Sequence, residues 1–309
     1  MEEAKRQSVP CNLCRADDSV AVTIKFGLTV VRCRQCSLVY TNPRPSLDFI
    51  WSRYGREYFE QEYLPSWGIH VGQINSEQLY QRHLPTLESL RPYRQTNWLL
   101  DVGAGAGLFL HAAQRDGWQV QGVELARSGV EFARSRLGLD VIQGQMTEVE
   151  LPDERYDVVT LQETIEHLLD PLADLREVHR VLRPGGVVSL TTPNFNSLAY
   201  KLIGREWSVL SPGEHLFYFI PQTLRAMLER AGFINIRVHT DGHLNPDNVH
   251  EKTLRVQLVQ RLLRRLNHFQ RINAPFQRCL ARMALGDSLV AHAEKPAASP
   301  METRVTKEA

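Results

Sequence analysis

Between residues 97 and 240 the chain alternates short apolar runs with segments in which apolar residues recur every three or four positions. The runs predict buried strands, and the periodic segments predict amphipathic helices. The expected strands of this region lie at residues 99–102, 119–124, 156–161, 187–190 and 234–238. A further strand is expected later in the chain, at 288–293. A helix is expected over 221–232, because it can begin at Pro221 and end at Gly232. Strands that alternate with helices are typical of an α/β fold with a doubly wound, mostly parallel sheet.

The first of these strands leads from Asp101 into three alternate glycines, Gly103, Gly105 and Gly107. Glycine adopts positive φ and lets the backbone approach a ligand, so the pattern suits a strand-to-helix turn around a nucleotide-like cofactor. An acid before the glycines suits a cofactor with a cationic amino-acid end better than one with a pyrophosphate. The pattern therefore favours S-adenosylmethionine, and a dinucleotide is the alternative.

The next expected strand ends in Glu124, where a carboxylate can accept hydrogen bonds from both hydroxyls of a ribose. With these motifs in this order, the chain resembles class I S-adenosylmethionine-dependent methyltransferases over roughly residues 97–240, with a last strand near 288–295. The resemblance implies a seven-stranded, Rossmann-like sheet. It implies donor contacts at Asp101, Gly103, Ala104, Gly105, Gly107, Glu124, Gln145, Met146 and Gln162. The first five would surround the methionine end, Glu124 would bind the ribose, the next two would lie near the adenine, and the last would lie beside the sulfonium.

Four of the five cysteines form two Cys-x-x-Cys pairs that are separated by 18 residues. They are Cys11, Cys14, Cys33 and Cys36. Known four-cysteine zinc sites share this spacing, and a hairpin with strands at 20–24 and 29–32 can carry both pairs. We therefore expect a structural zinc site, with a redox-active dithiol or the remnant of a lost site as alternatives.

Composition divides the rest of the chain around the core. The expected segments are a zinc ribbon over 1–42, a helical lid or connector over 43–96, the methyltransferase core over 97–240, a basic helical insertion over 241–286, a final core strand over 287–296 and a disordered tail over 297–309. The lid is rich in aromatic residues, which either cover the donor or pack the ribbon against the core.

The basic insertion predicts an amphipathic helix. Its apolar stripe is formed by Leu254, Leu258, Leu262, Leu266 and Phe269. Arginines surround the stripe at positions 255, 261, 264, 265 and 271. Such a helix either lies on a membrane surface or packs its stripe against its own protein.

A Glu-x-x-Glu-His pattern follows the strand that ends at residue 161. If residues 162–171 form a helical turn, then Glu163, Glu166 and His167 share a face that opens toward the methyl donor. Two carboxylates and an imidazole are suitable ligands for Mg²⁺, Mn²⁺ or Zn²⁺. The pattern resembles the metal-binding motif of ubiquinone-pathway O-methyltransferases and of small-RNA terminal 2′-O-methyltransferases. The second family implies a further histidine from a later loop, for which we expect His215.

Two roles are open for these side chains. A divalent ion held by them would bind a vicinal pair of hydroxyls and lower the pKa of the attacking one. Without a metal, His167 or His215 would act as a general base with Glu166 beside it, because imidazoles titrate near neutrality. In other class I members, a Glu-His in this place binds no metal and caps a helix or lines the pocket.

The chain has 309 residues, of which 36 are Lys or Arg and 35 are Asp or Glu, so its formal charge of +1 gives no drive toward nucleic acids. It has no apolar run of about 20 residues and no signal-like start, so we expect a cytoplasmic protein with, at most, peripheral membrane contact. The ribbon and core resemble bacterial methyltransferases of surface-polysaccharide and secondary-metabolite pathways. The expected function is O-methylation of a small molecule or of a glycan, which could be lipid-linked. Zinc-ribbon-guided RNA methylation and non-catalytic binding of S-adenosylmethionine are the alternatives.

Overall fold

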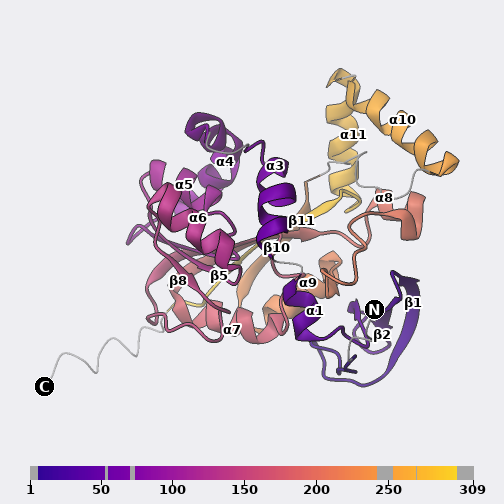
Figure 1. Cartoon of the computed structure of the whole chain (residues 1–309), viewed down its shortest axis with the longest axis horizontal. Coiled ribbons are helices and arrows are strands. Elements are labelled where there is room, and N and C mark those ends of the chain that lie inside the picture. Colours follow the sequence, from indigo (N-terminus) through magenta and orange to yellow (C-terminus); the bar gives the residue numbers. More distant parts are fainter. Residues whose placement is uncertain (1–5, 53–54, 70–73, 242–252, 269, 298–309) are drawn as a thin grey trace, which may run out of the picture.

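The structure, a computed structural model, describes residues 6–52, 55–69, 74–241, 253–268 and 270–297. A central seven-stranded sheet carries helices on both faces, and a smaller four-stranded sheet lies beside it (Figure 1). Of the expected tail over 297–309, residues 298–309 are outside the described residues.

The central sheet has the strand order β10-β11-β8-β7-β4-β5-β6. Its strands are β4 (Trp98–Val102), β5 (Gln119–Glu124), β6 (Val141–Gln143), β7 (Tyr156–Gln162), β8 (Leu182–Pro193), β10 (Ile234–Thr240) and β11 (Ser288–Glu294). Strands β4 to β8 pair in parallel, and β11 is antiparallel to both of its neighbours. The predicted α/β fold with a mostly parallel sheet is confirmed.

Alternate residues of each strand face opposite layers of helices, as the period of a strand requires. Leu99 packs on one face with residues of α4 (Ser76–Leu90), α5 (Leu108–Arg115) and α6 (Arg127–Leu137). Leu100 packs on the other face with residues of α7 (Pro171–Val181) and α9 (Pro221–Arg230). Both faces of the central strands β4 and β7 are therefore buried, which explains why apolar residues dominate them.

The smaller sheet has the order β1-β2-β3-β9. Its strands are β1 (Ser19–Lys25), β2 (Leu28–Cys33), β3 (Val39–Thr41) and β9 (Phe217–Tyr218), and all pair antiparallel. The hairpin expected between the cysteine pairs is present as β1 and β2. Strand β9 comes from the core, some 180 residues after β3 in the sequence, so the ribbon sheet is completed by a segment of the core.

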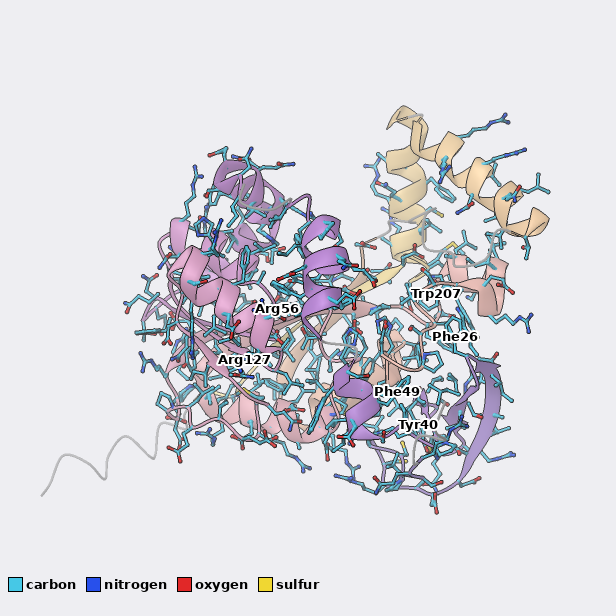
Figure 2. The ribbon with its side chains drawn as sticks, in the orientation of Figure 1. Phe26, Tyr40, Phe49, Arg56, Arg127 and Trp207 are labelled. Atoms are coloured by element: carbon cyan, nitrogen blue, oxygen red, sulfur yellow. The ribbon has the colours of Figure 1, made fainter. Side chains whose placement is uncertain are left out.

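The region expected to be helical before β4 is divided into short pieces. These are α1 (Leu47–Ser52), α2 (Arg56–Tyr58), a π-helical turn η1 (Phe59–Tyr63), α3 (Leu64–Ser66), α4 and a 3-10 turn η2 (Arg91–Tyr93). Phe59 and Tyr63 stack at a centroid distance of 5.5 Å, and Phe59 also meets Phe132 of α6 edge-on at 5.8 Å. The aromatic residues thus pack these pieces onto the core. Phe49 of α1 and Tyr40 of β3 lie where the ribbon sheet approaches the core (Figure 2).

The insertion forms α10 (Leu254–His268) and α11 (Gln270–Arg282), beyond α8 (Leu198–Ile203) and the 3-10 turn η3 (Gly204–Glu206) (Figure 1). Two residues of the predicted leucine stripe, Leu258 and Leu262, are exposed and do not pack on the protein. Val256 is buried instead, in the cluster that contains Ala199 and Ile203 of α8, so α10 docks through an adjacent face. Phe269 lies outside the described residues. None of the described helices is long and apolar enough to cross a membrane.

Candidate active site

A cavity of about 520 Å³ opens where β4, β5 and β7 end. Ligands of doubly wound sheets bind at this carboxyl edge. The predicted donor contacts that line it are Asp101, Gly103, Ala104, Gly105, Glu124, Gln145, Met146 and Gln162. Gly107 is the exception: it precedes α5 with φ of +74°, where a Cβ would come within 2.7 Å of Leu139. Gly107 therefore permits the turn and does not line the cavity.

The glycine turn is tightly enclosed. Gly103 has φ of +75°, and a Cβ there would lie 2.5 Å from the side chain of Thr164. Above Gly105, the Tyr63 hydroxyl would lie 2.2 Å from such a Cβ, and it also lies 3.4 Å from the backbone N of Ala106. The aromatic segment before α4 thus reaches over the turn through Tyr63, while Phe59 packs on the core.

Two buried acids face the cavity from neighbouring strands. Asp101 is 3% exposed and accepts a hydrogen bond of 2.6 Å from the Thr160 hydroxyl. Burial raises the pKa of Asp101 to about 7. The Glu124 carboxylate accepts hydrogen bonds from the backbone N–H groups of Gly105 (2.7 Å) and Ala126 (2.6 Å), and burial raises its pKa above the ordinary value.

The chemistry of this donor set fits S-adenosylmethionine. A cationic amino group would pair with the buried Asp101 carboxyl and favour its ionised form. Each oxygen of Glu124 keeps a second lone pair for a ribose hydroxyl. The side-chain nitrogen of Gln162 is buried without a hydrogen-bond partner. An unpaired buried amide is costly, so a bound group is expected to satisfy it.

The segment after β7 is a turn and not the helical turn that the spacing predicted. Glu163 has φ of +49°, and its backbone N–H donates to the Thr191 carbonyl at 3.0 Å. This left-handed residue breaks the helical spacing, so the three side chains do not share a helix face. Glu163 lines the cavity but lies outside the cluster described next.

Glu166, His167 and His215 each offer a ligand atom within 4.8 Å of those of the other two. The two imidazole rings meet edge-to-face, with centroids 4.6 Å apart. His167 Nδ1 lies 3.0 Å from the Glu214 carbonyl, which can only accept, so Nδ1 carries a proton and Nε2 keeps its lone pair. His167 Nε2 lies 3.9 Å from Glu166 Oε1. His167 also lines the cavity, so the cavity reaches the cluster at this residue.

The cluster contains polar atoms without protein partners. Glu166 Oε2 accepts a hydrogen bond of 2.9 Å from Thr192, but its Oε1 is buried without one, and so is Nδ1 of His215. Burial raises the pKa of Glu166 well above its ordinary value, and the Glu163 charge raises it further. Burial also lowers the pKa of both histidines, which are neutral. A bound cation would favour the ionised form of Glu166, and a carboxylate with two neutral imidazoles is a suitable ligand set for a divalent ion.

The four ribbon cysteines also converge. All four sulfur atoms lie within 4.8 Å of one another. The Sγ atoms of Cys11 and Cys36 are 3.4 Å apart, and those of Cys14 and Cys33 are 3.5 Å apart. Zinc–sulfur bonds of about 2.3 Å in a tetrahedron place sulfur atoms about 3.8 Å apart. The four thiols are free, so the geometry fits a structural zinc ion and excludes disulfides in this structure.

Residues 77–238, just over half of the chain, match the family described as a methyltransferase domain. The ubiquinone biosynthesis O-methyltransferase of Pseudomonas aeruginosa is 32% identical over 169 residues, which cover 47% of this chain and 72% of the relative. The protein of the same name from Aeromonas salmonicida is 34% identical over 161 residues, covering 48% and 67%. The chain belongs to the methyltransferase-domain family. With its fold and these relatives, it is a class I S-adenosylmethionine-dependent methyltransferase.

A solved structure supports the fold of this methyltransferase. Phosphoethanolamine N-methyltransferase 2 of Haemonchus contortus, in complex with S-adenosylmethionine, superposes with a TM-score of 0.54 at 19% identity. The superposition covers 84% of this chain and 63% of the other chain. At this identity the likeness concerns the fold alone.

Sequence reasoning missed residues that contact the site from strands. Thr160 holds Asp101, and Thr192 holds Glu166. Both threonines are buried in strands, where threonine is common for its β propensity, so no local pattern marks them. Their roles follow from pairing of β7 with β4 and β8, which only the folded sheet establishes.

Proposed function

We propose that this methyltransferase transfers methyl to a hydroxyl of a small molecule or of a glycan, with a divalent ion held by Glu166, His167 and His215. The observation that carries the proposal is the convergence of these side chains with two buried, unsatisfied ligand atoms. Burying polar atoms without partners is unfavourable, and a cation would satisfy both at once. The relatives named O-methyltransferases support an oxygen acceptor.

In this proposal, different residues of the chain bind the methyl donor and orient the acceptor. Asp101 and Glu124 hold the donor from β4 and β5, and the glycine turn encloses its methionine end. The Gln162 side chain would lie beside the bound donor, and its buried amide nitrogen would find an acceptor there. His167 lies at the cavity wall and orients the acceptor hydroxyl toward that group. A divalent cation, when bound, would lower the pKa of the acceptor hydroxyl. If no cation binds, His167 takes the proton at Nε2.

The cavity also limits the acceptor. Among the described residues that line it there is no lysine and no arginine, whereas Asp101, Glu124, Glu163 and Asp174 contribute acids. Aromatic rings also line the cavity, Trp51 included. A phosphate-rich acceptor such as RNA would find no basic side chain among these lining residues. The lining therefore supports an uncharged acceptor and counts against RNA.

Peripheral membrane contact is part of the proposal. Leu258 and Leu262 are 56% and 57% exposed on α10, and Arg261 and Arg265 beside them are exposed. Exposed leucines next to arginines fit the boundary between anionic headgroups and acyl chains. Such contact would bring the enzyme to a lipid-linked acceptor.

The test is transfer of labelled methyl from S-adenosylmethionine into fractionated cell extract containing glycans and metabolites, lipids, or RNA. Chelation under conditions that leave the zinc content of the ribbon unchanged should abolish transfer, and Mg²⁺ or Mn²⁺ should restore it. Glu166→Gln should bind S-adenosylhomocysteine as the wild type does, yet lose at least about 100-fold in rate. Glu88→Gln, at an exposed position of α4, is the matched control and should keep full activity.

Each other outcome has a definite meaning. Label in RNA would replace the proposal with ribbon-guided RNA methylation. Transfer that resists chelation but is lost in His167→Gln would replace the metal with a histidine base. Donor binding without label in any fraction would favour a non-catalytic binding protein.

A further inference from the structure

The four-cysteine ribbon contacts the segment that carries Glu166 and His167. Asn12 lies between the two cysteines of the first pair and is 4% exposed. Its amide nitrogen donates to Oδ1 of Asp170 at 2.7 Å, and its amide oxygen accepts the backbone N–H of Leu172 at 3.1 Å. The buried Asn12 side chain thus forms hydrogen bonds with both Asp170 and Leu172. Asp170 lies three residues after His167 of the cluster.

Arg44, just after the ribbon, reinforces the same contact. Its Nη1 donates to the Leu169 carbonyl at 2.8 Å, and its guanidinium lies over the ring of Phe217 at 5.2 Å. Arg44 therefore touches the segment of His167 and the strand that follows His215. The ion pair between Arg15 and Asp170 is exposed at 3.6 Å and adds little.

The ribbon also holds the segment that carries His215. The Thr41 hydroxyl lies within hydrogen-bond distance of the carbonyls of Pro212 (3.2 Å) and His215 (3.3 Å), and the Thr41 backbone N–H donates to the Leu216 carbonyl at 2.9 Å. Pairing of β3 with β9 continues this attachment at Tyr40 and Phe217. Thr41 is fully buried, so no water can replace these bonds.

The two segments are separate in the sequence, and their relative position decides whether Glu166, His167 and His215 can act together. The backbone N–H of Leu216 donates to the Glu166 carbonyl at 2.8 Å, and the ribbon braces both sides of that contact. We propose that the metal-loaded four-cysteine site positions this cluster, and that Asn12 is the positioning residue that connects the cysteine turn to it. This role rests on the function proposed for the cluster, but it makes no use of a particular acceptor.

Hydrogen exchange followed by mass spectrometry tests the connection without any acceptor. Wild type, Asn12→Ala and Arg34→Ala are compared after their zinc content has been measured. Arg34 is the matched control, because it pairs with Asp18 at 3.3 Å on the exposed side of the ribbon. Zinc-loaded Asn12→Ala should exchange about tenfold faster over residues 163–172, because two buried hydrogen bonds are lost. Exchange over the donor turn, residues 98–110, should not change.

Removing zinc from the wild type with a chelator should accelerate exchange over both 163–172 and 211–219. Arg34→Ala should behave as the wild type. The proposal is overturned if zinc-loaded Asn12→Ala exchanges at the wild-type rate over 163–172. It is equally overturned if zinc removal accelerates only the ribbon itself.

Titration with Mn²⁺, followed by electron paramagnetic resonance on the zinc-loaded proteins, separates this proposal from the proposed function. Wild type and Arg34→Ala should bind Mn²⁺ alike, and Asn12→Ala should bind it about tenfold more weakly. If the wild type binds no Mn²⁺, the metal-assisted function fails. The exchange rates over 163–172 would then still decide the positioning role of Asn12.

Discussion

Asp101 should make donor binding depend on pH. Its pKa is raised by burial from 3.8 to about 7, although Thr160 donates a hydrogen bond to it. The cationic amino group of the donor requires the ionised form. At pH 6 about one tenth of the free protein carries this carboxylate, and at pH 8 about nine tenths. S-adenosylhomocysteine should therefore bind about tenfold more tightly at pH 8 than at pH 6.

The same shift makes Asp101 costly in the free protein. A rise from 3.8 to about 7 corresponds to about 4 kcal/mol in favour of the protonated form. Because the folded pKa lies above the unfolded value, this stability is complete below about pH 4 and is lost as the pH rises to about 7. Asp101→Asn should therefore raise the free energy of unfolding at pH 8 by up to about 4 kcal/mol, while it abolishes the pH dependence of donor binding.

Isothermal titration calorimetry of S-adenosylhomocysteine between pH 6 and pH 8 measures the affinity. Repeating it in buffers of different ionisation enthalpy measures proton release, which should be about 0.9 per donor at pH 6 and about 0.1 at pH 8. Urea unfolding of the variant at pH 8 measures the gain in stability. Equal affinities at pH 6 and pH 8, or a pH dependence that survives in Asp101→Asn, would refute the reasoning.

Three further predictions concern other parts of the molecule. Gly103→Ala should weaken binding of S-adenosylhomocysteine at least about tenfold, because it combines an unfavourable positive φ with a clash; calorimetry showing unchanged affinity would contradict this. Asp157→Ala should lower the free energy of unfolding by about 3–5 kcal/mol, because it leaves the buried partner Arg183 unpaired; urea unfolding with an unchanged midpoint would exclude this. The double variant Leu258→Asp and Leu262→Asp should no longer sediment with phosphatidylglycerol vesicles that bring down the wild type, and a wild type that stays in solution would end the membrane proposal.

The central strands of the sheet could be predicted from the sequence because they are buried on both faces. Residues 156–161 form a mostly apolar run that contains Asp157 and Thr160, and every residue of β7 except Gln162 is buried. A continuous apolar run followed by a helical period has few other interpretations. The glycine turn adds positions where side chains have no room, and this constraint appears directly in the sequence as alternate glycines.

The helical segment before β4 could be predicted only coarsely. Its aromatic residues indicate burial, but they do not fix a helical period, and the segment forms three short helices and a π-helical turn before α4. Gly68 adopts φ of +72°, and Asn75 caps α4 by accepting the backbone N–H of Gln78. These local signals mark where a helix begins or ends, but not how the pieces pack on α5 and α6.

The cluster shows why spacing alone is insufficient for a site. Sequence spacing placed Glu163 with Glu166 and His167 only on the assumption of a helix, and the left-handed backbone at Glu163 removes that basis. His215 comes from a loop almost 50 residues later and reaches the other two through sheet pairing of its neighbours. No period in the sequence encodes that approach, because it depends on the ribbon sheet that β9 completes.

The buried acids of the donor site connect stability with function. Burial disfavours the charged forms of Asp101 and Glu124, so ionising them lowers the stability of the free protein. Both residues line the proposed donor site. A ligand that binds only the folded chain raises the free energy of unfolding, and the increase grows with its affinity. A donor whose cationic amino group pairs with Asp101 should act in this way. Because the charge on Asp101 is complete only above pH 7, S-adenosylhomocysteine should raise the melting temperature more at pH 8 than at pH 6. A larger rise at pH 6 would mean that hydrophobic contacts dominate donor binding, and that the carboxyl group of Asp101 is retained for its hydrogen bond with Thr160 rather than for its charge.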